Sequence, residues 1–272
     1  MQQKTIAFIG SGNMAQAIIS GLLNSGYPEH SIIATGRSEE KLAKLEEKYK
    51  ISVTTDNLKA AEQANVIVLA VKPQMMKGVC EQLASVDLSS KLIITIAAGI
   101  LSTKYPLWTQ QTLQLVRVMP NTPSLIGKGL SGLYANDDIA PEWSAFAESL
   151  MASVGDICWV KHESGINNII AAAGSAPAYF FYFMESIEKQ AIEQGFTPEM
   201  ARKIVTQVAL GSAHMVSSNP STPISTLREQ VTSKGGTTAE ALAVFEQQQL
   251  CDIVATAMKA AVTRAEEMQE LF

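Results

Sequence analysis

The chain has 272 residues, of which 47% are hydrophobic and 17% charged, and its formal net charge at pH 7 is −5. This length and apolar content are enough to bury one large core or two ordinary ones, which excludes a disordered chain. The net negative charge is modest, and the sequence contains no long run of like charges. It therefore argues against nucleic acid or an anionic membrane as a partner.

Three cysteines, Cys80, Cys158 and Cys251, stand far apart in the sequence. Their spacing fits neither a metal site nor a disulfide framework, and an odd number favours a reducing compartment. We expect three buried apolar thiols and no metal. The longest apolar run, residues 66–71, is too short to cross a bilayer, and the first residues lack a signal-peptide pattern. The expected location is the cytoplasm.

A glycine-rich segment follows the first apolar run. Residues 5–9 lead directly into Gly10-Ser11-Gly12-Asn13-Met14-Ala15, after which apolar residues recur at helical spacing. This pattern predicts a strand that turns into a helix, with Gly10 at the turn, Gly12 admitting a pyrophosphate and Ala15 allowing close packing. The helix N-terminus would hold the anion. We predict a dinucleotide site here, the alternative being a purely structural turn.

Up to about residue 160, short β-rich runs alternate with helical patterns, which predicts βαβ units in a parallel sheet. The predicted strands cover residues 5–9, 31–35, 51–53, 66–71, 92–97 and 115–119, and the runs 130–135 and 156–160 extend the sheet edge. Two of them, 66–71 and 92–97, are continuously apolar, as central strands covered on both faces are. We predict an α/β fold with an N-terminal Rossmann domain, doubly wound around a mostly parallel sheet, over residues 1–160.

After Glu163 the apolar residues recur at helical spacing, which predicts an all-helical second domain over residues 161–272. Pro177 lies inside the first long helical stretch, so we expect a kink or break near Ser175 and Ala176. A loop over 219–226 is expected to precede two last helices, at 238–248 and 250–269.

The residues that close the second strand bear on the choice of cofactor. Residues 34–38 contain no carboxylate to bind a ribose 2′-hydroxyl, whereas Arg37 and Ser38 offer groups for a 2′-phosphate. NADPH is therefore favoured, with NADH possible. Ser38 also fits the N-cap of the next helix. Lys72 stands at the end of another predicted strand, where it either contacts the cofactor or is simply exposed to solvent. Asn57 either contacts the ribose or belongs to the start of a helix.

A second small and polar segment, Gly235-Gly236-Thr237-Thr238, precedes a helical run. Its backbone N–H groups at a helix N-terminus suit a carboxylate. The threonine hydroxyls fit either hydrogen bonds to a substrate or a cap on the helix, and capping is the simpler interpretation.

Five motifs in this order resemble pyrroline-5-carboxylate reductase over nearly the whole chain. They are Phe-Ile-Gly-Ser-Gly-Asn-Met-Ala (8–15), Leu-Ala-Val-Lys-Pro (69–73), Arg-Val-Met-Pro-Asn-Thr-Pro (117–123), Gly-Ser-Ala-Pro-Ala-Tyr (174–179) and Gly-Gly-Thr-Thr-Ala-Glu-Ala-Leu (235–242). The resemblance implies NAD(P)H-dependent reduction of the cyclic imine 1-pyrroline-5-carboxylate to L-proline, the last step of proline biosynthesis. It also implies a helical C-terminal dimerisation domain, with a homodimer that assembles further.

The resemblance further implies a set of site residues. Those expected to line the cofactor are Ile9, Gly10, Ser11, Gly12, Asn13, Met14, Arg37, Ser38, Asn57, Ala70, Val71, Lys72, Pro73, Ile96, Ala97 and Ala98. Those expected to border the substrate are Glu163, Ser175, Thr237 and Thr238, with Gly235 and Gly236 donating amides to its carboxylate. Thr238 is the expected catalytic residue, because its hydroxyl can donate to or orient the imine nitrogen.

Two positions depart from the family pattern. Lys234 stands where proline is usual and Ala176 where glycine is usual, which bears on substrate fit and not on the reaction class. The alternatives are another imine reductase, a β-hydroxyacid-type dehydrogenase or a non-catalytic NADP-binding regulator. Dehydrogenases of that type use a helical lysine near the domain junction, and residues 165–187 contain none.

Overall fold

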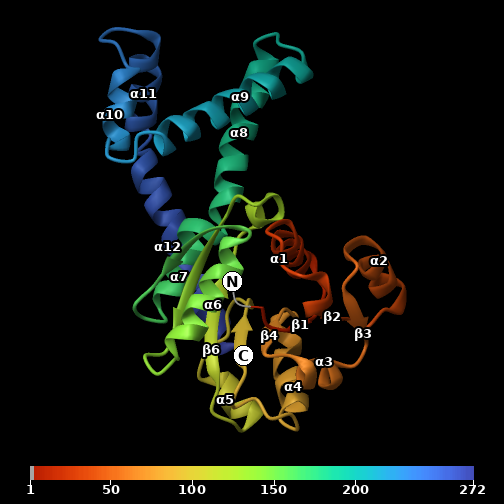
Figure 1. Cartoon of the computed structure of the whole chain (residues 1–272). Helices are drawn as coiled ribbons and strands as arrows, with labels where there is room; N and C mark the ends of the chain where they lie inside the picture. Colours follow the sequence, from red (N-terminus) through yellow and green to blue (C-terminus); the bar gives the residue numbers. More distant parts are fainter. Residues whose placement is uncertain (1–2) are drawn as a thin grey trace. The chain divides into compact units, whose positions relative to one another are not determined.

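The computed structural model describes residues 3–272, and its chain divides into two units (Figure 1). The first unit runs up to Ser175 and includes the returning segment Ala261–Phe272, and the second is Ala176–Ala260. The domain boundary predicted at residue 160 falls inside the first unit. As a division between cofactor and substrate domains it stays a prediction.

The first unit is built on one eight-stranded sheet in the order β3-β2-β1-β4-β5-β6-β7-β8. Every neighbouring pair is parallel except β6 and β7. The strands are β1 (Ile6–Ile9), β2 (Ile32–Thr35), β3 (Ser52–Thr54), β4 (Val66–Leu69), β5 (Leu92–Thr95), β6 (Gln114–Met119), β7 (Gly129–Ala135) and β8 (Gly155–Trp159). The predicted Rossmann sheet and both edge strands are confirmed, with bounds within two residues.

Helices cover both faces of this sheet because alternate side chains of each strand enter opposite cores. One core joins Phe8, Ile94 and their neighbours to α1 (Asn13–Asn24) and α6 (Pro141–Ala152). The other joins Ile9, Ile67 and their neighbours to α3 (Asn57–Gln63), α4 (Pro73–Leu83) and α5 (Lys104–Thr109). α2 (Glu39–Tyr49), η1 (Glu29–Ser31) and η2 (Thr122–Ile126) lie in the connections.

The chain after Glu163 is helical, as predicted. It forms α7 (Gly165–Ile169), η3 (Ile170–Gly174), α8 (Ala176–Glu193), α9 (Pro198–Ser217), α10 (Ile224–Gln230), α11 (Thr237–Gln247) and α12 (Leu250–Glu270). The loop predicted over 219–226 is wrong at its end, because α10 begins at Ile224. Pro223 is the N-cap of this short helix, and the buried side chain of Leu227 packs it against the protein. The sequence did not predict the helix because this segment is rich in Ser, Thr and Pro, which are typical of loops.

The expectation of three buried thiols is partly wrong. Cys80 on α4 is buried, but Cys158 on the edge strand β8 and Cys251 near the start of α12 are exposed. Burial raises the pKa of the Cys80 thiol to about 12. Over residues 3–272, no helix combines the length and the apolar character that a membrane crossing needs.

Pro177 breaks the helix that begins at α7, as predicted. It has no N–H to donate to the carbonyl of Ala173, four residues earlier, and residues 170–174 form a π-helical turn just before it. The side-chain Nδ2 of Asn121 donates to that carbonyl at 3.1 Å. Asn121 Oδ1 accepts the backbone N–H of Leu130 at 2.9 Å. Asn121 therefore satisfies the carbonyl that the proline leaves free and ties the turn to β7.

Replacing Asn121 with Ala should lower the free energy of unfolding by about 2 kcal/mol, because a buried carbonyl and a part-buried N–H both lose their partner. Urea denaturation measures this change. Asn136→Ala is the control: it removes an exposed hydrogen bond with Tyr134 and should cost less than about 0.5 kcal/mol. Equal midpoints for the two variants would contradict the role of Asn121.

Candidate functional site

The glycine turn lies between the ends of β1 and β4. Gly10 has φ +102°, and a Cβ there would lie 2.8 Å from the carbonyl oxygen of Ala70. Ala70 in turn donates its N–H to Ile9 O at 2.9 Å. Only glycine fits such a backbone and such a close approach. The turn therefore lies at the carboxyl edge of the sheet, beside the switch point where open α/β sheets bind ligands.

Helix α1 begins at this edge with free donors. Gly12 is its N-cap, no side chain caps it, and its first turn contains no acidic residue. A Cβ added at Gly12 would meet no atom within 4 Å, so the space beside the Cα of this N-cap residue is open. Ala15, 1% exposed, is the third small residue that the pattern requires. These features fit a dinucleotide pyrophosphate.

The ends of β2 and β3 contribute the next polar groups. Arg37 is exposed, while Ser38 caps α2 by accepting the Lys41 N–H at 3.4 Å. The predicted capping role of Ser38 is thus confirmed. A contact of Ser38 with a 2′-phosphate stays a prediction. Asn57 is half-buried as the first residue of α3, whose cap is the Asp56 carboxylate.

Two further strand ends meet the same edge. Lys72 is exposed at the N-cap of α4, and Pro73 is the first residue of that helix. Ile96 donates its N–H to Leu69 O at 3.2 Å, so residues 96–98 leave the sheet next to residues 70–73. Ala97 is only 8% exposed and belongs to the core, which leaves its side chain little room to contact a ligand.

A buried ion pair lies at the end of β6. Arg117, 2% exposed, donates through Nη1 to Glu163 Oε1. Ser102 donates its backbone N–H to the same oxygen at 2.6 Å and its hydroxyl to Oε2 at 3.0 Å. Both carboxylate oxygens of Glu163 therefore have partners within this unit. Any contact of Glu163 with a substrate would add to these bonds.

Two phenols lie near the ion pair and have shifted pKa values. Burial raises the pKa of Tyr105, which pairs with the Thr95 hydroxyl at 2.6 Å. Burial, followed by the Glu163 carboxylate, also raises the pKa of Tyr134. Both phenols therefore stay neutral at physiological pH and act as hydrogen-bonding groups.

The predicted carboxylate loop lies in the second unit. Gly235 has φ +70°, Gly236 is the N-cap of α11, and no side chain caps that helix. The interpretation of the threonines as caps is therefore wrong, because Gly236 holds the capping position. Thr237 and Thr238 occupy the first two helical positions and are exposed.

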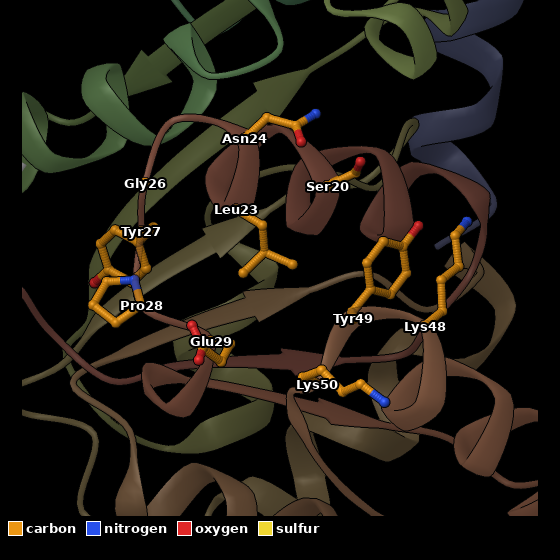
Figure 2. Close-up of a pocket in the computed structure, with 10 residues that line it drawn as sticks. All are labelled: Ser20, Leu23, Asn24, Gly26, Tyr27, Pro28, Glu29, Lys48, Tyr49 and Lys50. Atoms are coloured by element: carbon orange, nitrogen blue, oxygen red, sulfur yellow. The ribbon is translucent and has the colours of Figure 1, made fainter.

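A surface groove of about 610 Å³ lies beside the other end of α1 (Figure 2). Leu23 and Tyr49 face its interior, and Glu29, Lys48 and Lys50 stand around it. It adjoins the C-terminal ends of α1 and α2, which present carbonyl groups and not the N–H donors of a helix start. The groove includes none of the predicted site residues.

Comparison with known proteins matches both parts of the chain. Residues 163–268 match the model "pyrroline-5-carboxylate reductase dimerisation", and residues 5–99 match "NADP oxidoreductase coenzyme F420-dependent". A pyrroline-5-carboxylate reductase from Vibrio alginolyticus is 58% identical over 272 residues, covering 100% of both chains. The chain belongs to the pyrroline-5-carboxylate reductase family.

Solved structures of the family agree over the full length. The reductase from Coxiella burnetii is 40% identical with a TM-score of 0.93, covering 98% of this chain and 99% of that one. The Plasmodium falciparum enzyme, solved with NADP bound, is 27% identical with a TM-score of 0.88, covering 99% of both chains.

For this member of the family, the structure brings the predicted cofactor residues together at one sheet edge, at the ends of β1, β2, β4 and β5 and the start of α3. Ser175 follows the π-helical turn, where its N–H donates to Ile170 O at 2.7 Å. The residues 235–238 form a separate group in the other unit. The sequence indicated no role for Arg117 or Asn121, because their partners Glu163 and Ala173 are distant in the sequence.

Gly12→Ala tests whether the open space at α1 receives the cofactor. The added methyl group meets no protein atom, so the melting temperature should stay within about 2 °C. NADPH affinity, measured by fluorescence titration, should fall at least about tenfold, or 1.4 kcal/mol, because the methyl group blocks the pyrophosphate. Gly78→Ala, also in open space but on α4, is the control and should bind as the wild type does. Unchanged affinity in Gly12→Ala would exclude this pyrophosphate position.

Proposed function

We infer that this chain reduces 1-pyrroline-5-carboxylate to L-proline with NADPH, by hydride transfer to the C=N bond of the cyclic imine. The observation that carries this conclusion is the full-length likeness to pyrroline-5-carboxylate reductases, at 58% identity with one relative and a TM-score of 0.93 with one structure. The reaction is the last step of proline biosynthesis.

The cofactor residues of the proposal are those at the carboxyl edge of the sheet. The N–H groups at the start of α1 bind the pyrophosphate, since no side chain among residues 3–272 caps this helix. The exposed guanidinium of Arg37 binds the ribose 2′-phosphate, which favours NADPH over NADH. Residues 70–73 and 96–98 border the remaining part of the cofactor. When bound, NADPH supplies the hydride.

The substrate residues of the proposal lie on Gly235–Thr238, Ser175 and Glu163. The amides of Gly235 and Gly236 bind the carboxylate of the substrate, because α11 begins there without a side-chain cap. Lys234 beside them adds a positive charge, which attracts the negative carboxylate of the substrate. Ser175 and Glu163 border the ring.

Thr238 is the proposed catalytic residue. An imine carbon accepts a hydride more readily when its nitrogen carries a hydrogen bond or a proton, because positive charge then moves toward that carbon. Thr238 is exposed and free of a capping role, so its hydroxyl is available to donate to the nitrogen. Since a threonine hydroxyl does not ionise at neutral pH, the proton comes from solvent.

The second unit supports assembly between copies of the chain. Neither α8 nor α11 buries a residue, and Phe180 is 69% and Tyr182 73% exposed. An apolar cavity of about 500 Å³, lined in part by Phe183, Ile187 and Phe245, opens among α8, α9 and α11. Exposed apolar surface on this scale marks an interface. The chain forms a homo-oligomer, and we propose a dimer that assembles further, located in the cytoplasm.

The direct test follows NADPH absorbance after addition of pyrroline-5-carboxylate. The wild type should oxidise NADPH, while Thr238→Ala should turn over about 100-fold more slowly with NADPH affinity nearly unchanged, because one transition-state donor is lost. Thr238→Ser keeps the hydroxyl and should keep most of the turnover. Equal turnover in Thr238→Ala would remove this residue from the mechanism. A wild type that binds NADPH but reduces no imine would contradict the enzyme and support a regulator.

Light scattering of the full chain tests the assembly. The wild type should have a mass that is an even multiple of the 29.3 kDa chain. Phe180→Glu places a charge on the apolar face of α8 and should shift the mass toward the monomer, while NADPH titration confirms that the first unit remains folded. Glu199→Ala, a change at an exposed polar position of α9, should leave the mass unchanged. A monomeric wild type at micromolar concentration would contradict the proposal.

A further inference from the structure

Thr35 is a buried polar residue that none of the roles above uses. It is the last residue of β2, which lies between β1 and β3 in the sheet, and it is 1% exposed. The backbone N–H of Gly10, at the glycine turn, donates to Thr35 Oγ1 at 3.1 Å. Thr35 Oγ1 donates to Asn57 Oδ1 at 2.7 Å. One hydroxyl therefore joins the turn after β1 to the start of α3.

This arrangement fixes the orientation of the Asn57 amide. A threonine hydroxyl carries one hydrogen, and Thr35 gives it to Asn57 Oδ1. The Nδ2 group of Asn57, which has two N–H donors, is then left to point away from Thr35. The backbone of Asn57 is held as well, because the Asp56 carboxylate accepts the N–H groups of Leu58 and Lys59 at 2.9 and 3.1 Å.

The donors that remain free lie on the side of the sheet where the adenosine half of a dinucleotide binds. Asn57 is half-buried there, and Arg37 follows β2 at the same edge. A ribose 2′-phosphate has only acceptor oxygens at neutral pH and matches a group that offers only donors. The hydrogen bond from the buried Thr35 hydroxyl to Asn57 Oδ1 thus determines that a phosphate at this edge would contact the Nδ2 group of Asn57 and not its oxygen.

We propose that Thr35 is a positioning residue for the cofactor: it holds the Asn57 amide with its N–H groups toward the ribose 2′-phosphate and links that contact to the glycine turn. The proposal rests on NADPH being the cofactor of the proposed function. It makes the preference for NADPH depend on a residue that does not itself contact the phosphate.

The test measures binding of 2′,5′-ADP and of 5′-AMP to the full chain by calorimetry. Thr35→Val keeps the shape of the side chain but removes the hydroxyl, so it should weaken 2′,5′-ADP binding about tenfold and 5′-AMP binding by less than about twofold. Thr35→Ser keeps the hydroxyl and should bind both as the wild type does. In steady-state assays, Thr35→Val should raise the KM for NADPH while kcat holds.

Two variants of Asn57 separate positioning from folding. Asn57→Asp keeps an acceptor for Thr35 but turns an anionic oxygen toward the phosphate, so it should lose 2′,5′-ADP binding by more than tenfold while the melting temperature holds. Asn57→Ala should equal Thr35→Val, and the double variant Thr35→Val with Asn57→Ala should lose no more than either one.

Three results would overturn the proposal: 2′,5′-ADP binding to Thr35→Val at wild-type strength, equal losses for 2′,5′-ADP and 5′-AMP, or losses that multiply in the double variant. Neither probe contains a nicotinamide, so these results are independent of imine reduction. A chain that fails to reduce pyrroline-5-carboxylate would refute the proposed function and leave this test intact.

Discussion

The buried guanidinium of Arg117 constrains the rest of the chain. Its positive charge is 2% exposed inside β6, so the Glu163 carboxylate must stay beside it. Breaking such a pair by removing one partner costs about 3–5 kcal/mol, because the other charge is left buried and unpaired. The pair fixes the point from which the helical part of the chain starts, and Ser102 binds the same carboxylate. Glu163 stands two residues before α7, so the pair lies next to the start of that helix.

The need to pair buried polar groups also explains other contacts of the first unit. Thr35 pairs with Gly10 and Asn57, and Asn121 pairs with the carbonyl of Ala173. Donors that face outward, at the starts of α1 and α11, lack side-chain caps. The proposed function places the pyrophosphate of the cofactor at the first of these helix starts and the carboxylate of the substrate at the second.

The strands could be predicted because continuous apolar runs between turn residues leave few alternatives. The glycine turn could be predicted because the positions of Gly10, Gly12 and Ala15 require small residues. The burial of Arg117 could not be predicted, because its partner Glu163 lies 46 residues away in the sequence. The role of Asn121 likewise appears only when the fold brings it to the carbonyl that Pro177 leaves free. Helix α10 and the N-cap at Gly236 were mispredicted because Ser, Thr and Pro fit loops, caps and short helices equally well.

We propose that the cofactor, whose pyrophosphate lies at the glycine turn, presents its reduced nicotinamide to an imine whose carboxylate is held by the amides of Gly235 and Gly236. A crystal structure of the full chain with NADPH and L-proline tests it most directly. We expect the proline carboxylate on those amides, the ring nitrogen within hydrogen-bonding distance of a Thr238 hydroxyl and the ring carbon next to the nicotinamide. A structure in which no copy of the assembly brings residues 235–238 to the nicotinamide would contradict it.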